Sequence, residues 1–442
     1  MFFVYPALKD RSTKSKIYTE NYLYVLKSFF TKESYLFLIP YMNSIQNIKI
    51  KDYSYNLPDE KIAKYPLDKR DMSKLLIYNK GQISDDKFHN LDNYIEKDSL
   101  LIFNNTKVIQ ARIKFKKPTG ADIEIFCLEP YEPSDYQLAF NQTVSCKWIC
   151  LIGNLKKWKN NELLKEIEIN NEKIQLVVKK IDQIGKNYIL EFLWEKDKFT
   201  FGEILQKSGL TPIPPYLNRN SELIDKERYQ TIYSKKNGSV AAPTAGLHFT
   251  KSVFNKLKNK NVKIEELTLH VGAGTFRPVQ SETVAEHEMH TEHIIINKAL
   301  IENLIKYSDK IISVGTTSLR ALESIYWIGV KILNNNYKFH ITQWEPYNQK
   351  QKIGVEQSLQ AILQYMSNNN LSHIQASTQI IIVPGYEFKV INSLITNYHQ
   401  PKSTLLLLVA ALIGEEWRKV YNYSLDNNFR FLSYGDSSIL IP

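Results

Sequence analysis

The segment KIISVGTTSLRALESIYWI, residues 310–328, decides the fold class of this chain. It predicts a short apolar strand, a Gly-Thr-Thr turn, and then a helix with apolar residues at helical spacing. The same order returns in SLITNYHQPKSTLLLLVAALIGEEW, residues 393–417, where Ser403 is a suitable N-cap for an almost wholly apolar core helix. Strands that alternate with helices are typical of an α/β sheet that is at least partly parallel. We therefore expect an α/β main domain with a mixed sheet.

The middle of the chain has a different pattern. Short alternating runs such as ADIEIFCLE (121–129) and YILEFLWE (188–195) are separated by Asn, Gly and Lys, which is typical of a small all-β barrel or sandwich. The Pro-rich segment 209–219 marks the return to another domain. The sequence therefore predicts three parts: an N-terminal extension over 1–50, an α/β catalytic domain over 51–114 and 206–442, and an inserted β-barrel domain over 115–205.

Residues 1–50 have no clear role. Their apolar stretch is interrupted by Lys27, Lys32 and Glu33, so it is a poor membrane span. It also lacks the basic start and small-residue cleavage site of a signal peptide, and Asp10 argues against a transit peptide. We expect no association with a membrane.

Charge and cysteine content limit the partners and the compartment. Lys and Arg exceed Asp and Glu by 57 to 46, and the pI is about 9.1. This diffuse excess fits a polyanion such as nucleic acid, and equally a Lys-rich composition inherited from an AT-rich genome. The three cysteines, Cys127, Cys146 and Cys150, form no C-x-x-C pair. A reducing cytoplasm is the expected location.

Polar residues cluster where several predicted strands end. In open α/β sheets, ligands bind outside the carboxyl ends of the strands, so five such loops together indicate one site. The loops are FNNTK (103–107), APTAGLHF (242–249), LHVGAGTFR (269–277), VGTTSLR (314–320) and TNYHQPKST (396–404).

The loop VAAPTAGLHFT, residues 240–250, contains no charged residue. Pro243 and Gly246 predict a tight bend, since Gly246 can adopt a positive φ, and Thr250 is a plausible N-cap for the helix that follows. The bend would present Thr244, His248 and backbone N–H groups to a polar ligand. The alternative is a tight turn with a histidine packed in the core.

Two further motifs permit several interpretations. Gly272 and Gly274 supply G-x-G, but Arg277 stands where a dinucleotide fingerprint needs its third glycine; we expect these glycines to let a ligand approach the backbone beside His270. In HEMHTEH, residues 287–293, the three histidines are three residues apart. On a helix their rings would spread over about a third of its circumference. A substrate-contacting His290, a structural role and a metal site all remain open there.

The loops, in this order, closely resemble the S-adenosylmethionine:tRNA ribosyltransferase-isomerase family of queuosine biosynthesis. The similarity extends from about Lys51 to the end of the chain, and four positions, Lys74, Asn105, Tyr398 and Gln400, depart from the family's common residues. The segments that carry it include YNLPDEKIAKYP, RDMSKLLIYN, LLIFNNTKVIQARI, TPIPPYL, ERYQTIYSKKNGSVAAPTAGLHFT, LTLHVGAGTFRPV, EHEMHTEH, VGTTSLRALES, LITNYHQPKSTLLLLVAAL and FRFLSYGDSSIL.

The resemblance implies a specific reaction. S-adenosylmethionine would act as a ribosyl donor, consumed as a substrate, with no cofactor and no metal. The acceptor would be a 7-aminomethyl-7-deazaguanine base at the wobble position of a tRNA anticodon loop, and the products epoxyqueuosine-tRNA, adenine and methionine. The family also implies an α/β domain with an inserted β-barrel. A monomer is the default expectation.

Within this reaction, His248, His270 and His399 are the catalytic candidates because imidazoles move protons near neutral pH. Arg277 and Arg320 could hold the methionine carboxylate or a tRNA phosphate. Residues expected to orient substrate are Thr244, Thr316, Thr317 and Asn397, and the other expected binding residues are Asn104, Thr106, Lys107, Arg112, Gly246, Gly272, Gly274 and His290. The geometric expectation is that the loops carrying His248, His270, Thr316 and His399 converge around one sulfonium nucleoside.

The inserted domain is expected to help dock the tRNA through Lys156, Lys157, Lys159 and Trp148, because RNA loops are bound through phosphate contacts and base stacking. Two other classes compete with this interpretation. A methyltransferase should show a Gly-rich loop after an early strand, which this sequence lacks. An RNA-binding module would explain the charge but not five clustered polar loops.

Overall fold

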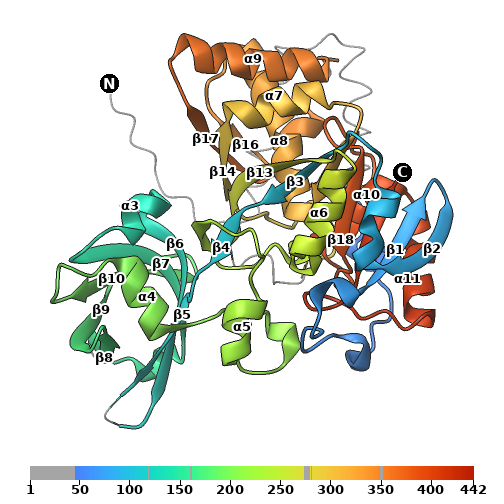
Figure 1. Cartoon of the computed structure of the whole chain (residues 1–442). Coiled ribbons are helices and arrows are strands. Elements are labelled where there is room, and N and C mark those ends of the chain that lie inside the picture. Colours follow the sequence, from blue (N-terminus) through green and yellow to red (C-terminus); the bar gives the residue numbers. More distant parts are fainter. Residues whose placement is uncertain (1–44, 118, 160–161, 273–278, 280, 349–351) are drawn as a thin grey trace.

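The computed structural model describes residues 45–442 except 118, 160–161, 273–278, 280 and 349–351. Two large sheets organise the chain, and Figure 1 shows them side by side, with the smaller one at the lower left. A third sheet consists of two parallel strands, β4 (Thr106–Val108) and β12 (Lys236–Ser239). The chain forms β4 where it passes from the main sheet to the second sheet, and β12 where it returns. The α/β class and the mixed character of the main sheet are as the sequence predicts.

The main sheet has ten strands, and the four at its centre carry the site. Among these, β13, β3, β15 and β18 run parallel to one another, whereas β19 returns antiparallel to β18. In spatial order the strands are β16 (His340–Ile341), β17 (His373–Thr378), β14 (Glu292–Asn297), β13 (Lys263–His270), β3 (Leu100–Asn104), β15 (Ile311–Val314), β18 (Ser393–Asn397), β19 (Ser437–Ile441), β1 (Lys74–Asn79) and β2 (Gln82–Lys87).

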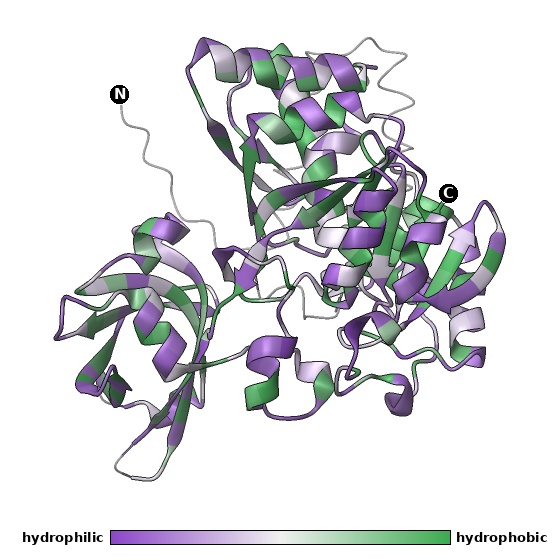
Figure 2. Cartoon of the chain, in the orientation of Figure 1, coloured by the Kyte–Doolittle hydropathy of each residue, from purple (hydrophilic) through white to green (hydrophobic). Residues whose placement is uncertain are grey.

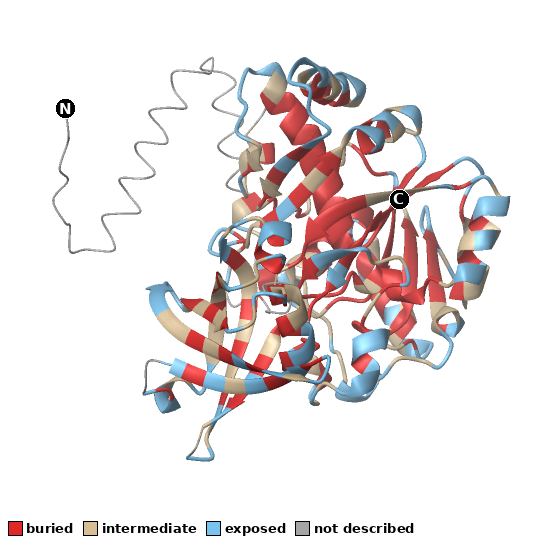
Figure 3. Ribbon diagram, turned by 60° about the vertical axis from the view of Figure 1, so that its left-hand side comes forward, coloured by how far each residue is buried: buried red, intermediate tan, exposed pale blue. Residues whose placement is uncertain are grey.

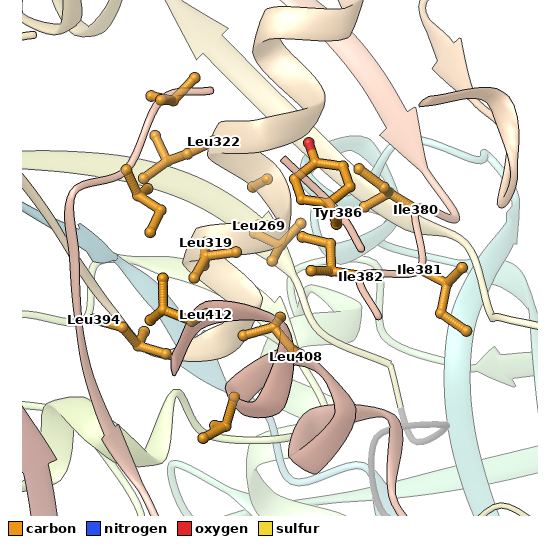
Figure 4. Packing of buried hydrophobic residues seen from close by; sticks show 14 of the residues in the cluster. Leu269, Leu319, Leu322, Ile380, Ile381, Ile382, Tyr386, Leu394, Leu408 and Leu412 are labelled. Carbon is orange, nitrogen blue, oxygen red and sulfur yellow. The ribbon is translucent and has the colours of Figure 1, made fainter. Parts of the chain in front are cut away.

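Alternate side chains of the central strands pack on opposite faces of the sheet. Leu100 and Ile102 of β3 join the core beneath α7 to α11, while Leu101 and Phe103 join a second core beneath α6. Figure 4 shows Leu319 packed close to Leu394 and Leu412, and Figure 3 shows the buried strands and helix faces. These helices are α6 (Lys251–Asn259), α7 (Lys298–Lys306), α8 (Thr316–Leu333), α9 (Val355–Asn368), α10 (Thr404–Ile413) and α11 (Glu416–Asp426).

The second sheet has seven antiparallel strands and its own core. Its spatial order is β11, β5, β6, β7, β10, β9, β8, and its hydrophobic cluster includes Trp148, which is fully buried. Figure 2 shows its alternating hydrophilic and hydrophobic residues. The strands are β5 (Arg112–Lys116), β6 (Asp122–Glu132), β7 (Ser145–Gly153), β8 (Glu162–Ile169), β9 (Glu172–Ile184), β10 (Asn187–Trp194) and β11 (Gly209–Leu210), with α3 (Tyr136–Phe140) and α4 (Phe201–Ser208) beside them and α5 (Leu223–Arg228) following.

The sheet of this insert extends beyond the predicted range and is curled. The sheet runs from 112 to 210, whereas the sequence predicts 115–205. It curls so that β5 and β8 approach each other, but no pairing joins these two strands in the described part of the chain. Trp148 was expected on the RNA-binding surface; its burial among aromatic rings makes that part of the prediction wrong.

The local capping signals are confirmed. The Thr250 side chain accepts a hydrogen bond from the Val253 N–H, 3.3 Å away, at the start of α6. Ser403 does the same for Leu406 at 3.2 Å at the start of α10. The α10 helix is buried nearly all round, as its apolar sequence predicts. No helix in the described ranges is long and apolar enough to cross a membrane.

Candidate active site

Four predicted loops follow the carboxyl ends of four neighbouring strands. β13, β3, β15 and β18 are mutually parallel, so their ends, at His270, Asn104, Val314 and Asn397, meet at one edge of the main sheet. The fifth loop forms the short 3₁₀ helix η7 (Thr244–His248), which lies against β18. The expectation that separate loops gather at one edge is therefore confirmed.

A cavity opens at this edge, and we call it the sheet-edge cavity. None of the described residues that line it is Asp, Glu, Lys or Arg. Its apolar wall includes Ala241, Ala242, Ala245, Val271, Leu405 and Leu432. Its polar groups come from Tyr216, Tyr229, Thr244, Thr316, Thr317, Thr396, Asn397, His399, Gln400, Ser403 and Ser433.

Two helices begin at the cavity. Gly315, with a φ of 93°, turns the chain from β15 into α8, and Thr316 and Thr317 in the first turn line the cavity. Ser403, the N-cap of α10, lines it as well. Because helix N-termini carry unpaired N–H groups and partial positive charge, this wall suits an anionic group such as a carboxylate.

His399 lies at the cavity with both its ring and its backbone held in place. Its Nε2 is 3.0 Å from Thr396 Oγ1, its N–H donates to Tyr421 Oη at 3.1 Å, and Tyr55 Oη donates to its carbonyl at 2.5 Å. Burial lowers the pKa of His399 to about 3. The ring is therefore neutral at pH 7.

His248 lies one hydrogen bond behind the cavity. Its Nε2 is 3.0 Å from Asn397 Oδ1, and its Nδ1 is 2.8 Å from Ser73 Oγ. The Asn397 Nδ2 donates to the carbonyls of Leu432 and Ser433, so Oδ1 is the acceptor and His248 Nε2 carries the proton. Burial lowers the pKa of His248 to about 4. This neutral imidazole fixes the orientation of Asn397.

His270 faces a different cavity, between the two large sheets. Its ring stacks on Tyr136 of α3 with centroids 4.0 Å apart and planes at 7°, and burial lowers its pKa to about 4. Gly272 and His290 line the same cavity. The three imidazoles therefore do not surround one ligand: neighbouring strand residues point to opposite faces, and Val271, not His270, faces the sheet-edge cavity.

Acid should destabilise the fold through these rings. An unfolded histidine binds a proton near pH 6.5, whereas folded His399 stays neutral to about pH 3. Below pH 6.5 the unfolded state thus binds more protons, and stability falls by about 1.4 kcal/mol per pH unit for one such histidine. We expect His399→Gln to remove the contribution of this histidine to the pH dependence of the free energy of unfolding between pH 6 and 4.

Urea unfolding at several pH values measures the effect. His373→Gln, at an exposed histidine at the start of β17, is the matched control and should keep the parent slope. If His399→Gln shows the parent slope too, the ring is not held neutral by burial.

Several predicted binding residues lie away from the cavity. Asn104 Nδ2 donates to the Leu269 carbonyl at 2.9 Å, and its Oδ1 accepts from the Thr106 N–H and hydroxyl, so both residues fasten β3 to β13. Arg112 belongs to the second sheet, where its Nη1 is 3.3 Å from Glu124 Oε1. Lys107 is exposed at cavities beside the insert.

The predicted reason for Gly246 is wrong. Gly246 has no positive φ; instead, a Cβ on it would lie 1.8 Å from Tyr233 Oη and 3.0 Å from Thr231 Cγ2. Close packing, not backbone conformation, requires glycine here. Gly274 and Arg277 lie outside the described residues.

Arg320 is already paired. Its Nη1 lies 2.7 Å from Glu292 Oε2, its Nε donates to the Ile380 carbonyl at 3.0 Å, and both charged side chains are buried. Burial alone would raise the pKa of Glu292, but Arg320 and His290 bring it below its usual value. A role for Arg320 as a substrate ligand stays a prediction.

The HEMHTEH segment is not a helix. It is irregular until β14 begins at Glu292, so its three rings share no helical face, and His290 Nε2 lies 3.5 Å from Glu292 Oε1. Within the described ranges no group of three or more His, Cys, Asp or Glu is placed to hold a metal ion.

Several polar groups of the cavity are not among the residues predicted from the sequence. Tyr216 Oη and Ser433 Oγ are 2.5 Å apart, and the buried Tyr229 hydroxyl has no well-aligned partner among the described residues. All three lie in motifs that carry the family resemblance, TPIPPYL, ERYQTIY and FRFLSYG. That location was the available signal, but nothing local distinguishes them from core residues.

Comparison with known proteins gives a consistent result. The family model described as "Queuosine biosynthesis protein" matches residues 50–440. A protein of Francisella tularensis subsp. novicida, named S-adenosylmethionine:tRNA ribosyltransferase-isomerase, is 35% identical over 399 residues, covering 89% of this chain and 100% of the relative. A Trichlorobacter lovleyi protein of the same name is 34% identical over 402 residues, covering 89% and 99%. A crystal structure titled S-adenosylmethionine tRNA ribosyltransferase, from Thermotoga maritima, is 25% identical, covers 88% and 100%, and has a TM-score of 0.43.

Proposed function

The chain belongs to the S-adenosylmethionine:tRNA ribosyltransferase-isomerase family of queuosine biosynthesis, and from that membership we propose the full reaction. The enzyme transfers and isomerises the ribosyl group of S-adenosylmethionine onto a 7-aminomethyl-7-deazaguanine base at the wobble position of tRNA. The products are epoxyqueuosine-tRNA, adenine and methionine. The observation that carries this proposal is the sheet-edge cavity, which has no charged residue among its described lining and where family motifs from six separate parts of the chain meet.

The cavity suits the parts of S-adenosylmethionine. The methionine carboxylate fits the N-termini of α8 and α10, beside Thr316, Thr317 and Ser403. The sulfonium is a soft cation, and aromatic faces attract such cations; Tyr216 and Tyr398 line the cavity. The Tyr229 hydroxyl, which has no well-aligned partner among the described residues, offers a hydrogen bond to the nucleoside. A donor bound in this way would have its ribose directed toward Asn397 and His399.

The chemistry needs proton transfer in a site without competing charges. A sulfonium acidifies the adjacent 5′ carbon. His399 is our candidate to accept that proton, because it is the one imidazole among the described residues that line the cavity. Its lowered pKa means that it enters the reaction neutral. The acceptor amine must also be unprotonated to attack, and no described carboxylate lines the cavity to stabilise its cation. Asn397, held by His248, orients the ribose.

The remaining expectations follow from the same proposal. The insert, as a barrel-like unit, contributes Lys156, Lys157 and Lys159 to tRNA docking, and these lysines are exposed. The enzyme consumes S-adenosylmethionine as a substrate and uses no cofactor or metal. We propose that it acts in the cytoplasm as a monomer; its cysteines are buried free thiols.

One incubation separates this function from its rivals. The enzyme is given S-adenosylmethionine labelled in the adenine ring together with tRNA carrying the aminomethyl base. Release of free labelled adenine, dependent on that tRNA, is the expected result. Labelled S-adenosylhomocysteine would instead indicate methyl transfer, and no product with tight tRNA binding would indicate a binding module. Unmodified tRNA is the matched control and should give no adenine.

A further inference from the structure

A second cavity lies behind His248 and gathers three arginines. Arg70, Arg228 and Arg430 line it together with Ser73, Ser433 and Tyr434. Arg70 donates to the carbonyls of Gln230 at 2.7 Å and Glu227 at 3.0 Å, Arg430 to those of Tyr434 at 2.9 Å and Tyr65 at 3.3 Å, and Arg228 to that of Leu67. We call this group the arginine pocket.

The positive charge of the arginine pocket is poorly compensated. Carbonyl oxygens satisfy hydrogen bonds but do not neutralise charge. The carboxylate of Asp436 is 3.9 Å from Arg430 Nε, yet both its oxygens already accept backbone N–H groups. Burial and the neighbouring Arg228 lower the pKa of Arg70, while Glu227 opposes them only in part. Within the described part of the chain, the buried Arg228 Nε has no hydrogen-bond partner.

The arginine pocket is one of a series of adjoining hollows. Ser433 lines both the sheet-edge cavity and the arginine pocket. Arg70 lines both the arginine pocket and a shallow hollow with Lys107 and Lys226, and these two lysines line a further cavity at the insert. In Figure 1 this region is marked by α5, which lies between the insert and the rest of the molecule. We call the five cations of this series the basic track: Arg70, Lys107, Lys226, Arg228 and Arg430.

The outer end of the track also exposes apolar side chains. Leu223 is 92% exposed, and Ile232 is 45% exposed; both line the hollow with Lys107 and Lys226. Glu227 is the one carboxylate among the described residues that line this hollow. Spaced cations with apolar groups between them suit a single RNA strand, whose phosphates alternate with sugars and unpaired bases.

We propose that the basic track binds the phosphate backbone of the substrate RNA strand, with the arginine pocket holding the phosphate next to the base that enters the sheet-edge cavity. This inference rests on the proposed function, because a base bound in that cavity must keep its backbone within one nucleotide of it. An acidic protein segment would share the charge preference, but it would have no reason to begin at a nucleoside cavity.

Charge removal at the exposed end of the track tests the proposal without disturbing packing. Lys107→Ala and Lys226→Ala are combined, and the matched control is K298A/K306A on α7, at the opposite end of the molecule in Figure 1. Binding of fluorescent tRNA is measured from 50 to 200 mM KCl. The logarithm of the association constant falls linearly with the logarithm of the salt concentration. Removing two phosphate contacts should make this slope less steep by about 1.4. The ratio of the variant Kd to the wild-type Kd should therefore be about sevenfold larger at 50 mM than at 200 mM KCl, with no such change in the control.

The arginine pocket has its own paired test. Arg228→Lys keeps the charge and Arg228→Gln removes it, and both replace the guanidinium that donates to the Leu67 carbonyl. R228K should bind tRNA several-fold more tightly than R228Q and keep the parent salt slope. Equal losses in the two variants would mean a structural role only and would overturn the phosphate assignment.

The outcomes also separate this inference from the proposed function. The wild-type protein could release adenine while K107A/K226A binds tRNA with the Kd and salt slope of the control. In that case the assignment of the basic track to RNA binding is wrong, and the proposed function stands. If the wild-type protein releases no adenine, the function fails by its own test. Displacement of tRNA by polyglutamate at concentrations where an RNA of equal charge fails to compete would assign the track to an acidic protein instead.

Discussion

Arg320→Met is expected to lower the free energy of unfolding by about 3–5 kcal/mol, since it leaves a buried carboxylate without its partner. Arg320 and Glu292 are 2.7 Å apart, and their side chains are 4% and 0% exposed. Without Arg320, the burial of Glu292 should raise its pKa above the usual value, so the carboxyl group would take up a proton on mild acidification. The loss should therefore be smaller at pH 5 than at pH 7, as measured by urea unfolding.

Two companion variants identify the cause. In the double variant E292Q/R320M neither buried charge remains, and most of the lost stability should return. Lys173→Ala breaks an ion pair of similar length, 2.9 Å, on the exposed surface, and should leave stability nearly unchanged because water screens such pairs. A double variant as unstable as R320M would show that packing, not the unpaired charge, causes the loss.

Gly246→Ala is expected to reduce turnover on the order of 100-fold, because small displacements of positioning residues have effects of this size. The new Cβ would lie 1.8 Å from Tyr233 Oη, so η7 must shift, and with it Thr244 and Ala245 of the sheet-edge cavity. Such overpacking should also destabilise the fold by about 1–3 kcal/mol. Adenine release and thermal unfolding measure the two effects.

The clash itself can be removed. The Tyr233 hydroxyl is buried and lies near Thr231 without a well-aligned hydrogen bond, so Tyr233→Phe should be nearly neutral. In G246A/Y233F the shortest contact disappears, while Cζ at 2.9 Å remains, and turnover should recover in part. Gly354→Ala, where a Cβ meets nothing within 4 Å, is the control. If Y233F gives no recovery, the Tyr233 contact is not the reason that glycine is needed.

The family, the α/β class and the edge of the sheet that carries the site follow from local sequence. A run such as residues 310–328 contains its own strand, turn and helix signals, and Thr250 and Ser403 cap helices through contacts three residues away. Parallel strands then place their carboxyl ends at one edge wherever they lie in the sheet. That is why the loops at Thr316 and Asn397 were predictable as neighbours.

What only the tertiary structure decided is where each side chain points and what surrounds it. Sequence places His248, His270 and His399 in polar loops alike, yet only His399 lines the sheet-edge cavity. Burial by distant segments also lowers all three pKa values, and Arg320 finds Glu292 on another strand. Tyr216 and Ser433, 217 positions apart, meet at the cavity wall. Periodicity and capping act over a few residues, whereas solvation, charge pairing and close packing depend on which distant segments meet in the fold.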